Sequence, residues 1–99
     1  MKLIIAIVRP HTIDKIVVAL EDIENFPGIT VTDVEGFGKR LQTPGYDALN
    51  PFKLKKQIEI AANDEMVEQI VAALREHAHT GKKGDGIILV LPIEEAVLI

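Results

Sequence analysis

The sequence contains no cysteine, no serine and no tryptophan among its 99 residues. Without cysteine the chain can form neither a disulfide nor a thiolate nucleophile, and nothing in it points to an oxidising compartment. Without serine, and without a prominent pair of carboxylates or of histidine and carboxylate, the usual nucleophilic and acid–base schemes lack their parts. We therefore expect no catalytic residues and a protein that is not an enzyme.

Aromatic residues and positive charge are also scarce. Three phenylalanines and one tyrosine offer few stacking surfaces for bases, and the formal net charge of −4 argues against a nucleic-acid partner. The apolar run at residues 3–8 is too short for the core of a secretory signal, and Arg9-Pro10 interrupts it. The sequence predicts a cytoplasmic protein that does not bind nucleic acid.

Apolar residues make up 47 % and charged residues 26 % of the chain, a composition typical of one globular domain, which we assign to residues 1–99. Runs of β-branched residues and alternating patterns predict strands, whereas apolar residues three and four apart predict helices. The predicted strands cover residues 3–8, 29–37, 52–62 and 87–91. The predicted helices start at Thr12 and after an Asn63 N-cap, and they end by Phe26 and near His77–His79.

This order of elements predicts an α+β fold. We expect a ferredoxin-like βαββαβ sandwich, in which two helices cover one face of a four-stranded antiparallel sheet. The first and last strands are apolar at every position, so their second face should also be buried. Because a wet apolar face of that size is a liability, we expect the chain to oligomerise through the open face of the sheet.

The segment Thr80–Gly86 holds three glycines and two lysines between the second predicted helix and the last predicted strand. Glycine lets the backbone approach a ligand closely and lysine supplies positive charge, a combination suited to an anion. The spacing is not that of the phosphate loop of nucleotide hydrolases, which runs from a strand into a helix. From the residues alone, an ordinary turn between helix and strand is an equal alternative.

Two other features invite a functional interpretation. Residues 39–51 contain two prolines and no sustained period, and a connection of this length inside a compact domain is typically functional. His77 and His79 are two residues apart, so on a helix they point in different directions. Histidine is favoured at a helix C-terminus by the helix dipole, and we assign no metal ligands to this pair.

Four short motifs occur in order along the chain: Arg9-Pro10, Thr30-Val31-Thr32, Gly36-Phe37-Gly38 and Thr80–Gly86. Together with the predicted βαββαβ plan, they resemble the PII signal-transduction protein family over most of the chain. The resemblance implies a homotrimer that binds an adenine nucleotide in clefts between subunits. Thr80–Gly86 would form one side of each cleft, and Gly36–Arg40 of a neighbouring subunit would form the other.

The resemblance also implies roles for single residues. Ile7 and Thr30 would line the base and sugar, Glu59 would lie near the adenine, and Lys39 would replace a phosphate-binding arginine. Asp85 would approach the phosphates and ribose, and its carboxylate is a reasonable acceptor for a hydroxyl group. The full implied nucleotide-binding set is Ile7, Thr30, Gly36, Phe37, Gly38, Lys39, Glu59, Lys82, Gly84, Asp85 and Gly86.

The sequence departs from the family at several charged positions. Ile87 stands where the family has a lysine, and Leu98 lies in the region of two family arginines. Arg40 replaces a glutamine that helps to bind magnesium and 2-oxoglutarate, and a cation there would repel the metal. Since each charge-assisted hydrogen bond contributes about 1.5–3 kcal/mol, we expect AMP or ADP as the effector in preference to ATP with magnesium.

The loop 39–51 is shorter than in nitrogen-regulating members of the family. The resemblance implies that this loop, with Arg40 and Tyr46, binds a partner, which would be a membrane transporter or an enzyme. An alternative is a nucleotide-independent interaction protein or a metal-sensing protein with the same fold. Metal-dependent stabilisation that is lost when His77 and His79 are replaced by alanine would favour that alternative.

Overall fold

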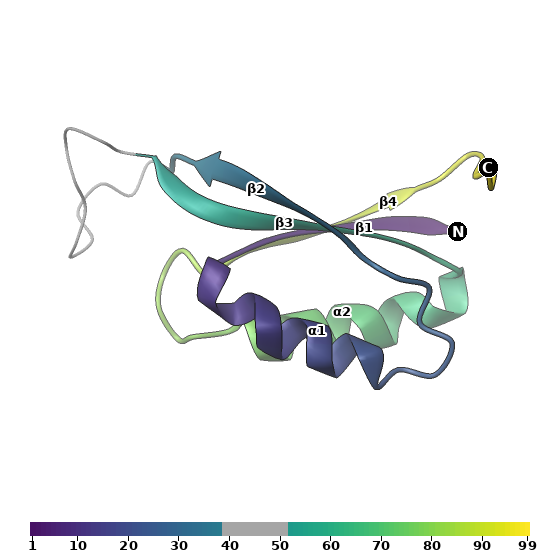
Figure 1. The fold of residues 1–99 in the computed structure, drawn as a ribbon, viewed down its shortest axis with the longest axis horizontal. Coiled ribbons are helices and arrows are strands. Elements are labelled where there is room, and N and C mark those ends of the chain that lie inside the picture. Colours follow the sequence, from purple (N-terminus) through teal and green to yellow (C-terminus); the bar gives the residue numbers. More distant parts are fainter. Residues whose placement is uncertain (39–51) are drawn as a thin grey trace.

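The computed structural model describes residues 1–38 and 52–99. In these two ranges the chain forms a 3₁₀ turn, two helices and four strands, arranged in two layers (Figure 1). The elements in chain order are β1 (Lys2–Val8), a 3₁₀ turn (Pro10–Thr12), α1 (Ile13–Glu21), β2 (Thr30–Gly36), β3 (Lys53–Ala62), α2 (Asp64–Ala78) and β4 (Gly86–Pro92).

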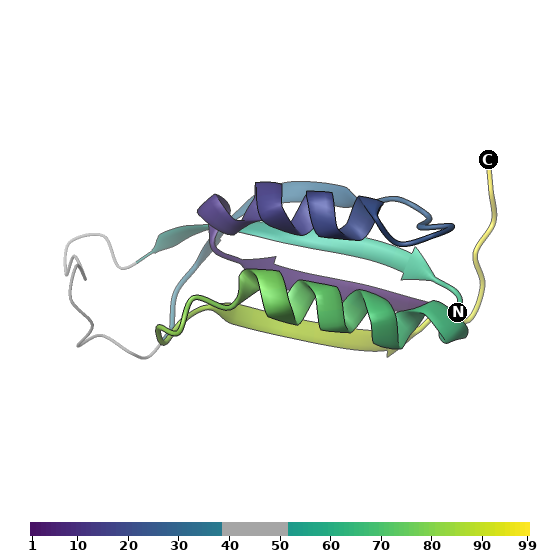
Figure 2. The same ribbon diagram turned by 90° about the horizontal axis from the view of Figure 1, so that it is seen from below.

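The four strands form one sheet in the order β2-β3-β1-β4, and every neighbouring pair is antiparallel. Both helices lie side by side on the same face of this sheet, α1 along the β2–β3 side and α2 along the β1–β4 side (Figures 1 and 2). The predicted ferredoxin-like βαββαβ fold is confirmed.

The hydrophobic core lies between the sheet and the helices. Alternate residues of β1 and β3 point towards the helices and are buried there, and α1 and α2 each contribute an apolar stripe. The largest fully buried apolar side chains are Ile4, Val8, Ile16, Leu20, Ile58, Ile60, Ile70 and Leu74. Burying each such side chain stabilises the fold by about 1.5–3 kcal/mol, so this one layer of contacts supports both helices.

No helix formed by residues 1–38 or 52–99 covers the opposite face of the sheet. Residues directly opposite each other on antiparallel strands share a face, and the register pairs Leu3 with Leu91, Ile5 with Leu89 and Ile7 with Ile87. We call these six residues the aliphatic face. Within one chain, the three side chains on β1 are half-buried and the three on β4 are 40–52 % exposed.

The expectation that β1 and β4 are buried on both faces therefore does not hold within a single chain. Strand β4 is an edge strand with only β1 beside it, and Val90, which faces the helix layer, is still 45 % exposed. Burial of the aliphatic face would require a second molecule. No helix in the described ranges is long and apolar enough to cross a membrane.

Local details differ slightly from the predicted boundaries. The 3₁₀ turn precedes α1, and the buried Thr12 closes it by donating both its backbone N–H and its hydroxyl to the Arg9 carbonyl oxygen. Asn63 occupies the predicted N-cap of α2, but its side chain makes no capping hydrogen bond. Instead, the N-terminal ammonium group of Met1 contacts the Asp64 carboxylate at 2.9 Å.

Candidate functional site

The glycine-rich loop connects the end of α2 to the start of β4 and lies at one end of the sheet (Figure 1). The register pairs Gly86, the first residue of β4, with Val8, the last residue of β1. The same end of the sheet holds the end of β2 and the start of β3, where Gly36 pairs with Lys53. Segments that are distant in the sequence therefore meet around the loop.

The Asp85 carboxylate is the centre of the hydrogen bonding in this loop. Its Oδ2 accepts from the backbone N–H of Thr80 at 2.7 Å and from that of Gly81 at 3.2 Å. Its Oδ1 accepts from the Thr80 hydroxyl and from Arg9 Nε, the latter at 3.1 Å. The hydrogen bonds from the Thr80 hydroxyl and amide, followed by the bonds from Arg9 and Gly81, hold the pKa of Asp85 far below its ordinary value.

Two cationic side chains donate to backbone carbonyl groups of the loop. Arg9 Nη2 donates to the Lys83 carbonyl oxygen at 2.7 Å, and Lys55 Nζ donates to that of Gly84 at 3.1 Å. Partial burial lowers the pKa of Lys55, the Arg9 guanidinium lowers it further, and Asp85 opposes the shift. With Lys82 and Lys83 on the loop itself, the region holds four cationic side chains around one carboxylate.

Lys55 also connects the loop to the end of β2. A Cβ built on Gly36 would lie 3.6 Å from Lys55 Cγ, and Lys55 Nζ reaches Gly84. The two glycine segments that the resemblance assigned to opposite sides of a cleft, on different subunits, thus both lie near Lys55 of the same chain. Arg9 and Lys55 were not in the predicted site. In the sequence, Arg9 was marked only by its charge just after the first predicted strand. Lys55 was marked only as one of several nearby lysines.

Three other predicted residues lie on the open face of the sheet. Glu59 of β3 pairs with Thr30 of β2. Ile7 of β1 pairs with Gln57, which lies two residues before Glu59 on β3 and therefore on the same face of the sheet. Gln57 Nε2 donates to the Glu59 carboxylate at 3.2 Å. The structure therefore gathers Ile7, Thr30 and Glu59 on one surface, where Ile7 is also part of the aliphatic face.

The end of the β2–β3 hairpin carries the remaining predicted residues. Phe37 stacks in a tilted geometry on Phe52, with ring centroids 5.7 Å apart, and both rings are about half exposed. Gly38 follows Phe37 at the limit of the described residues. Lys39, Arg40 and Tyr46 fall within 39–51 and lie outside the described residues.

Of the two neighbouring histidines, only His77 is helical, because α2 ends at Ala78 and His79 has an extended backbone. His77 lies on α2 beside Glu76, whereas His79 Nδ1 lies 3.6 Å from Asp85 Oδ2. Among the described residues, no three histidine, aspartate or glutamate side chains are grouped so that they could hold a metal ion.

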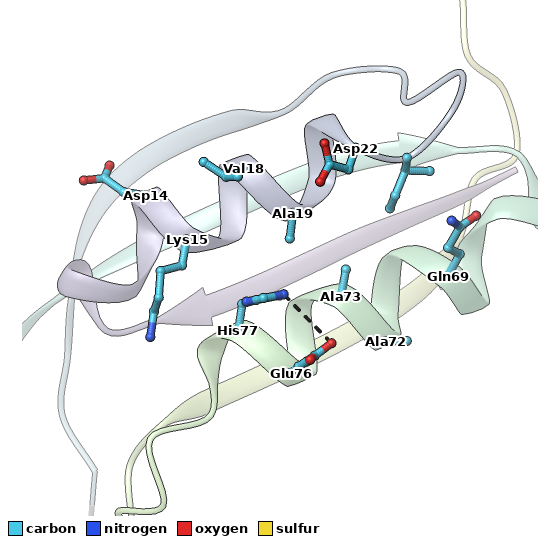
Figure 3. A pocket seen from close by; sticks show the side chains of 11 residues that line it. Asp14, Lys15, Val18, Ala19, Asp22, Gln69, Ala72, Ala73, Glu76 and His77 are labelled. Carbon is cyan, nitrogen blue, oxygen red and sulfur yellow. Dashed lines mark ion pairs between the residues drawn. The ribbon is translucent and has the colours of Figure 1, made fainter.

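A groove of about 820 Å³ runs between the outer surfaces of α1 and α2, on the side of the molecule away from the sheet (Figure 3). Its floor is formed by small and apolar side chains, such as Ala19 and Ala73, and carboxylates of Asp14, Asp22 and Glu76 lie along it. None of the predicted binding residues that the structure describes lines this groove. Its acidic side chains make it a poor site for an anionic ligand.

The family described as "Nitrogen regulatory protein P-II" matches the chain over residues 1–99. Proteins named nitrogen regulatory protein P-II are similar to this chain: that of Azospirillum brasilense is 39 % identical and that of Bradyrhizobium diazoefficiens 40 % identical, each alignment covering 100 % of the chain and 91 % of the relative. A protein named nitrogen regulatory protein GlnK2, from Haloferax mediterranei, is 35 % identical, with 100 % of the chain and 83 % of the relative covered.

These relatives are aligned over 103 positions, more than the 99 residues of the chain, so each has residues that this chain lacks. The match over the full chain, the confirmed fold and the motif at Thr80–Gly86 agree with the resemblance seen in the sequence. The chain belongs to the nitrogen regulatory protein P-II family of signalling regulators.

Proposed function

We propose that this protein is a cytoplasmic regulator that binds a small anionic effector, an adenine nucleotide such as AMP or ADP, in the clefts between the subunits of a homotrimer. The effector would select one arrangement of the loop 39–51, and that loop would act on a membrane transporter or an enzyme. We assign no catalytic role to any residue and no nucleic-acid partner.

The observation that supports this proposal is the convergence of Arg9, Lys55, Lys82 and Lys83 on a loop that is already ordered by its own hydrogen bonds. Within the described ranges, the backbone N–H groups of Lys83 and Gly84 have no acceptor. Free amides beside cations are the groups that hold a phosphate outside a helix N-terminus. A phosphate oxygen would compete with the Gly84 carbonyl for Lys55.

The number of phosphates follows from the supply of cations. Two of the Arg9 nitrogens are already engaged by Asp85 and by the Lys83 carbonyl, and Ile87 brings no charge to the start of β4. Among the described residues, Lys55, Lys82 and Lys83 then remain for the effector. Because each charge-assisted hydrogen bond contributes about 1.5–3 kcal/mol, this supply suits one or two phosphates better than three.

The aliphatic face supports the trimer. Its six side chains form a continuous patch on β1 and β4 that includes Ile7, and Glu59 of the proposed base-binding surface lies on the same face of the sheet. A second subunit on this patch would bury apolar area and complete a cleft beside Ile7 and Glu59. The oligomer and the binding site are therefore parts of a single proposal.

Calorimetric titration of the purified protein with AMP, ADP and ATP tests the effector. Lys55→Gln removes the cation next to Gly84, and we expect it to weaken nucleotide binding at least about tenfold, the equivalent of one charge-assisted bond. Lys56→Gln is the matched control, because Lys56 points to the other face and pairs with Asp33. If none of the three nucleotides produces heat or a thermal shift, the nucleotide proposal is wrong.

A metal-sensing protein is the second candidate, and the proximity of His79 to Asp85 is the observation in its favour. Addition of Zn²⁺ to the protein would then raise its melting temperature. The effect should disappear in the double variant His77→Ala, His79→Ala. If Zn²⁺ does not change the melting temperature, this candidate is wrong. A nucleotide-independent interaction protein then remains as the alternative.

A further inference from the structure

We infer that Asp85 and Arg9 are positioning residues that hold the glycine-rich loop in its binding shape, and that the Asp85 carboxylate does not bind the sugar of the effector. We call Arg9, Thr80, Gly81 and Asp85 the loop latch. The inference about the sugar rests on the proposed function. The inference about the shape of the loop concerns the ligand-free protein and stands without it.

The first argument counts hydrogen bonds. An ionised carboxylate offers about four lone-pair sites, and four donors reach Asp85: the Thr80 amide, the Thr80 hydroxyl, the Gly81 amide and Arg9 Nε. The side chain is also only 21 % exposed. A ribose hydroxyl would have to displace one of these donors, and the gain would be close to zero.

The second argument concerns what the latch connects. The Asp85 side chain bonds back to Thr80 and Gly81 and so closes the six-residue segment 80–85 into a ring, which fixes the chain where it leaves α2. Arg9 then joins this ring to the end of β1, because one guanidinium donates from Nε to Asp85 and from Nη2 to the Lys83 carbonyl oxygen. The loop is thus attached to the sheet through side chains, at a point before β4 begins.

The third argument concerns the anchor of the latch. Arg9 is held at its backbone, since its carbonyl oxygen accepts both the amide and the hydroxyl of the buried Thr12. The Arg9 side chain is only 27 % exposed. A fixed guanidinium loses less conformational freedom when it binds, which makes it suited to hold a second segment in place.

The backbone N–H groups of Lys83 and Gly84 are among the donors of the loop that have no acceptor within residues 1–38 and 52–99. The latch therefore sets the direction of the groups that would meet an anion. Under this assignment, the site recognises the anionic group of its ligand through the loop, and the sugar hydroxyls make no contact with Asp85.

Amide hydrogen exchange of the ligand-free protein tests the shape of the loop. In Asp85→Asn an N–H₂ group replaces one acceptor, and in Arg9→Gln the guanidinium is lost. We expect the amides of Thr80 and Gly81 to exchange at least about tenfold faster in both variants, as the loss of one charge-assisted bond predicts. In Thr80→Ser, which keeps the hydroxyl, the amides of residues 80 and 81 should exchange at the wild-type rate. Unchanged exchange in Asp85→Asn would overturn the inference.

Arg9→Lys gives a second, milder variant if Arg9→Gln folds poorly. Lysine keeps the charge but cannot donate from two nitrogens in the fixed geometry of a guanidinium. We expect exchange at Thr80 and Gly81 to lie between that of the wild type and that of Arg9→Gln. Exchange equal to the wild type would show that charge alone is sufficient and that Arg9 does not position the loop.

Titrations with AMP, 2′-deoxy-AMP and 3′-deoxy-AMP test the sugar. A positioning role predicts that Asp85→Asn and Arg9→Gln each lower the affinity for all three ligands by the same factor. If Asp85→Asn weakens the binding of AMP but not that of a deoxy ligand, and Arg9→Gln shows no such difference between the ligands, Asp85 binds the sugar. The inference is then wrong. If none of the ligands binds even to the wild type, the proposed function fails, and the exchange experiment alone decides on the latch.

Discussion

Gly86 lies against the backbone of Ile7 so closely that a Cβ added to Gly86 would stand 1.9 Å from the Ile7 carbonyl oxygen. Its φ of +132° is also a conformation that residues with a side chain rarely adopt. Gly86 begins β4 beside the end of β1. The glycine is therefore required for the sheet itself, whether or not the loop binds a phosphate.

Gly86→Ala should be strongly destabilising. The backbone strain costs about 1–3 kcal/mol, and the contact with Ile7 adds about 1–3 kcal/mol as the strand shifts. Urea unfolding followed by circular dichroism measures the sum. A stability within about 1 kcal/mol of the wild type would contradict the close approach.

Gly28→Ala is the matched control for this variant. Gly28 has a similar φ of +126°, but an added Cβ would meet nothing within 4 Å. Gly28→Ala should lower the free energy of unfolding only by the backbone strain, about 1–3 kcal/mol. The difference between the two variants then isolates the contact between Gly86 and Ile7, and equal losses would show that the contact is relieved at little cost.

The stability of the protein should fall in acid partly because of Asp85. Its pKa in the folded state lies below the ordinary 3.8, chiefly through the hydrogen bonds from Thr80. A carboxylate of this kind stabilises the fold fully above its ordinary pKa, and the contribution is lost as the pH falls through the lower pKa of the folded state. Asp85→Asn has no such titration.

The difference in the free energy of unfolding between the wild type and Asp85→Asn should therefore be constant from about pH 7 to about pH 5 and shrink below about pH 3. Urea titrations at each pH measure it. Glu95→Gln, on an exposed side chain after β4, tests for a general effect of charge. A difference that grows in acid would contradict the contribution of the Asp85 hydrogen bonds.

A charge on the aliphatic face should disrupt the oligomer. Leu89 is 41 % exposed within one chain and pairs with Ile5 on the open face. Leu89→Lys would place an ammonium group in the proposed interface, and an unpaired buried charge is strongly unfavourable. Sedimentation velocity should show monomer where the wild type shows trimer.

Val18→Lys is the control for this prediction. Val18 is 62 % exposed, but it lies on α1 along the groove between the helices (Figure 3). The variant should sediment like the wild type. If the wild type is itself a monomer at micromolar concentration, the proposed trimer is wrong.

Binding of an anion should be accompanied by proton uptake at Lys55. Burial and the nearby Arg9 lower the pKa of this ammonium group below 10.5, and a phosphate beside it would raise the pKa again. Calorimetry with AMP in two buffers of different ionisation enthalpy measures the protons taken up. The uptake should increase from about pH 8 to about pH 9 and vanish in Lys55→Gln, whereas a net release would contradict it.

Most of the fold could be predicted from periodicity. The alternation in residues 52–62 and the helical spacing from Ile13 to Leu20 each gave the correct element, because one face of each is buried against a common core. The ends were less accurate. α1 stops at Glu21, and β4 includes both Gly86 and Pro92, since strand pairing with β1 extends past the apolar run.

The site could be predicted only in part. Thr80–Gly86 was recognised from its glycines and lysines, and the family supplied Ile7, Thr30 and Glu59, which the sheet brings to one face. Arg9 was noted only as part of the Arg9-Pro10 motif, and neither Arg9 nor Lys55 was assigned to the binding set. Their contacts with Lys83 and Gly84 join residues that are far apart in the sequence, and no local pattern encodes such a contact.

The sequence by itself determined the order of the elements, the apolar faces that form the core, and the family, because each depends on residue types at short spacings. The tertiary structure decided which polar groups meet. Arg9 reaches Asp85 only because β1 and β4 are neighbours in the sheet, although 76 positions separate these residues in the chain. The tertiary structure also shows that four donors already occupy the Asp85 carboxylate, and our inference that Asp85 supports the loop rests on this contact set.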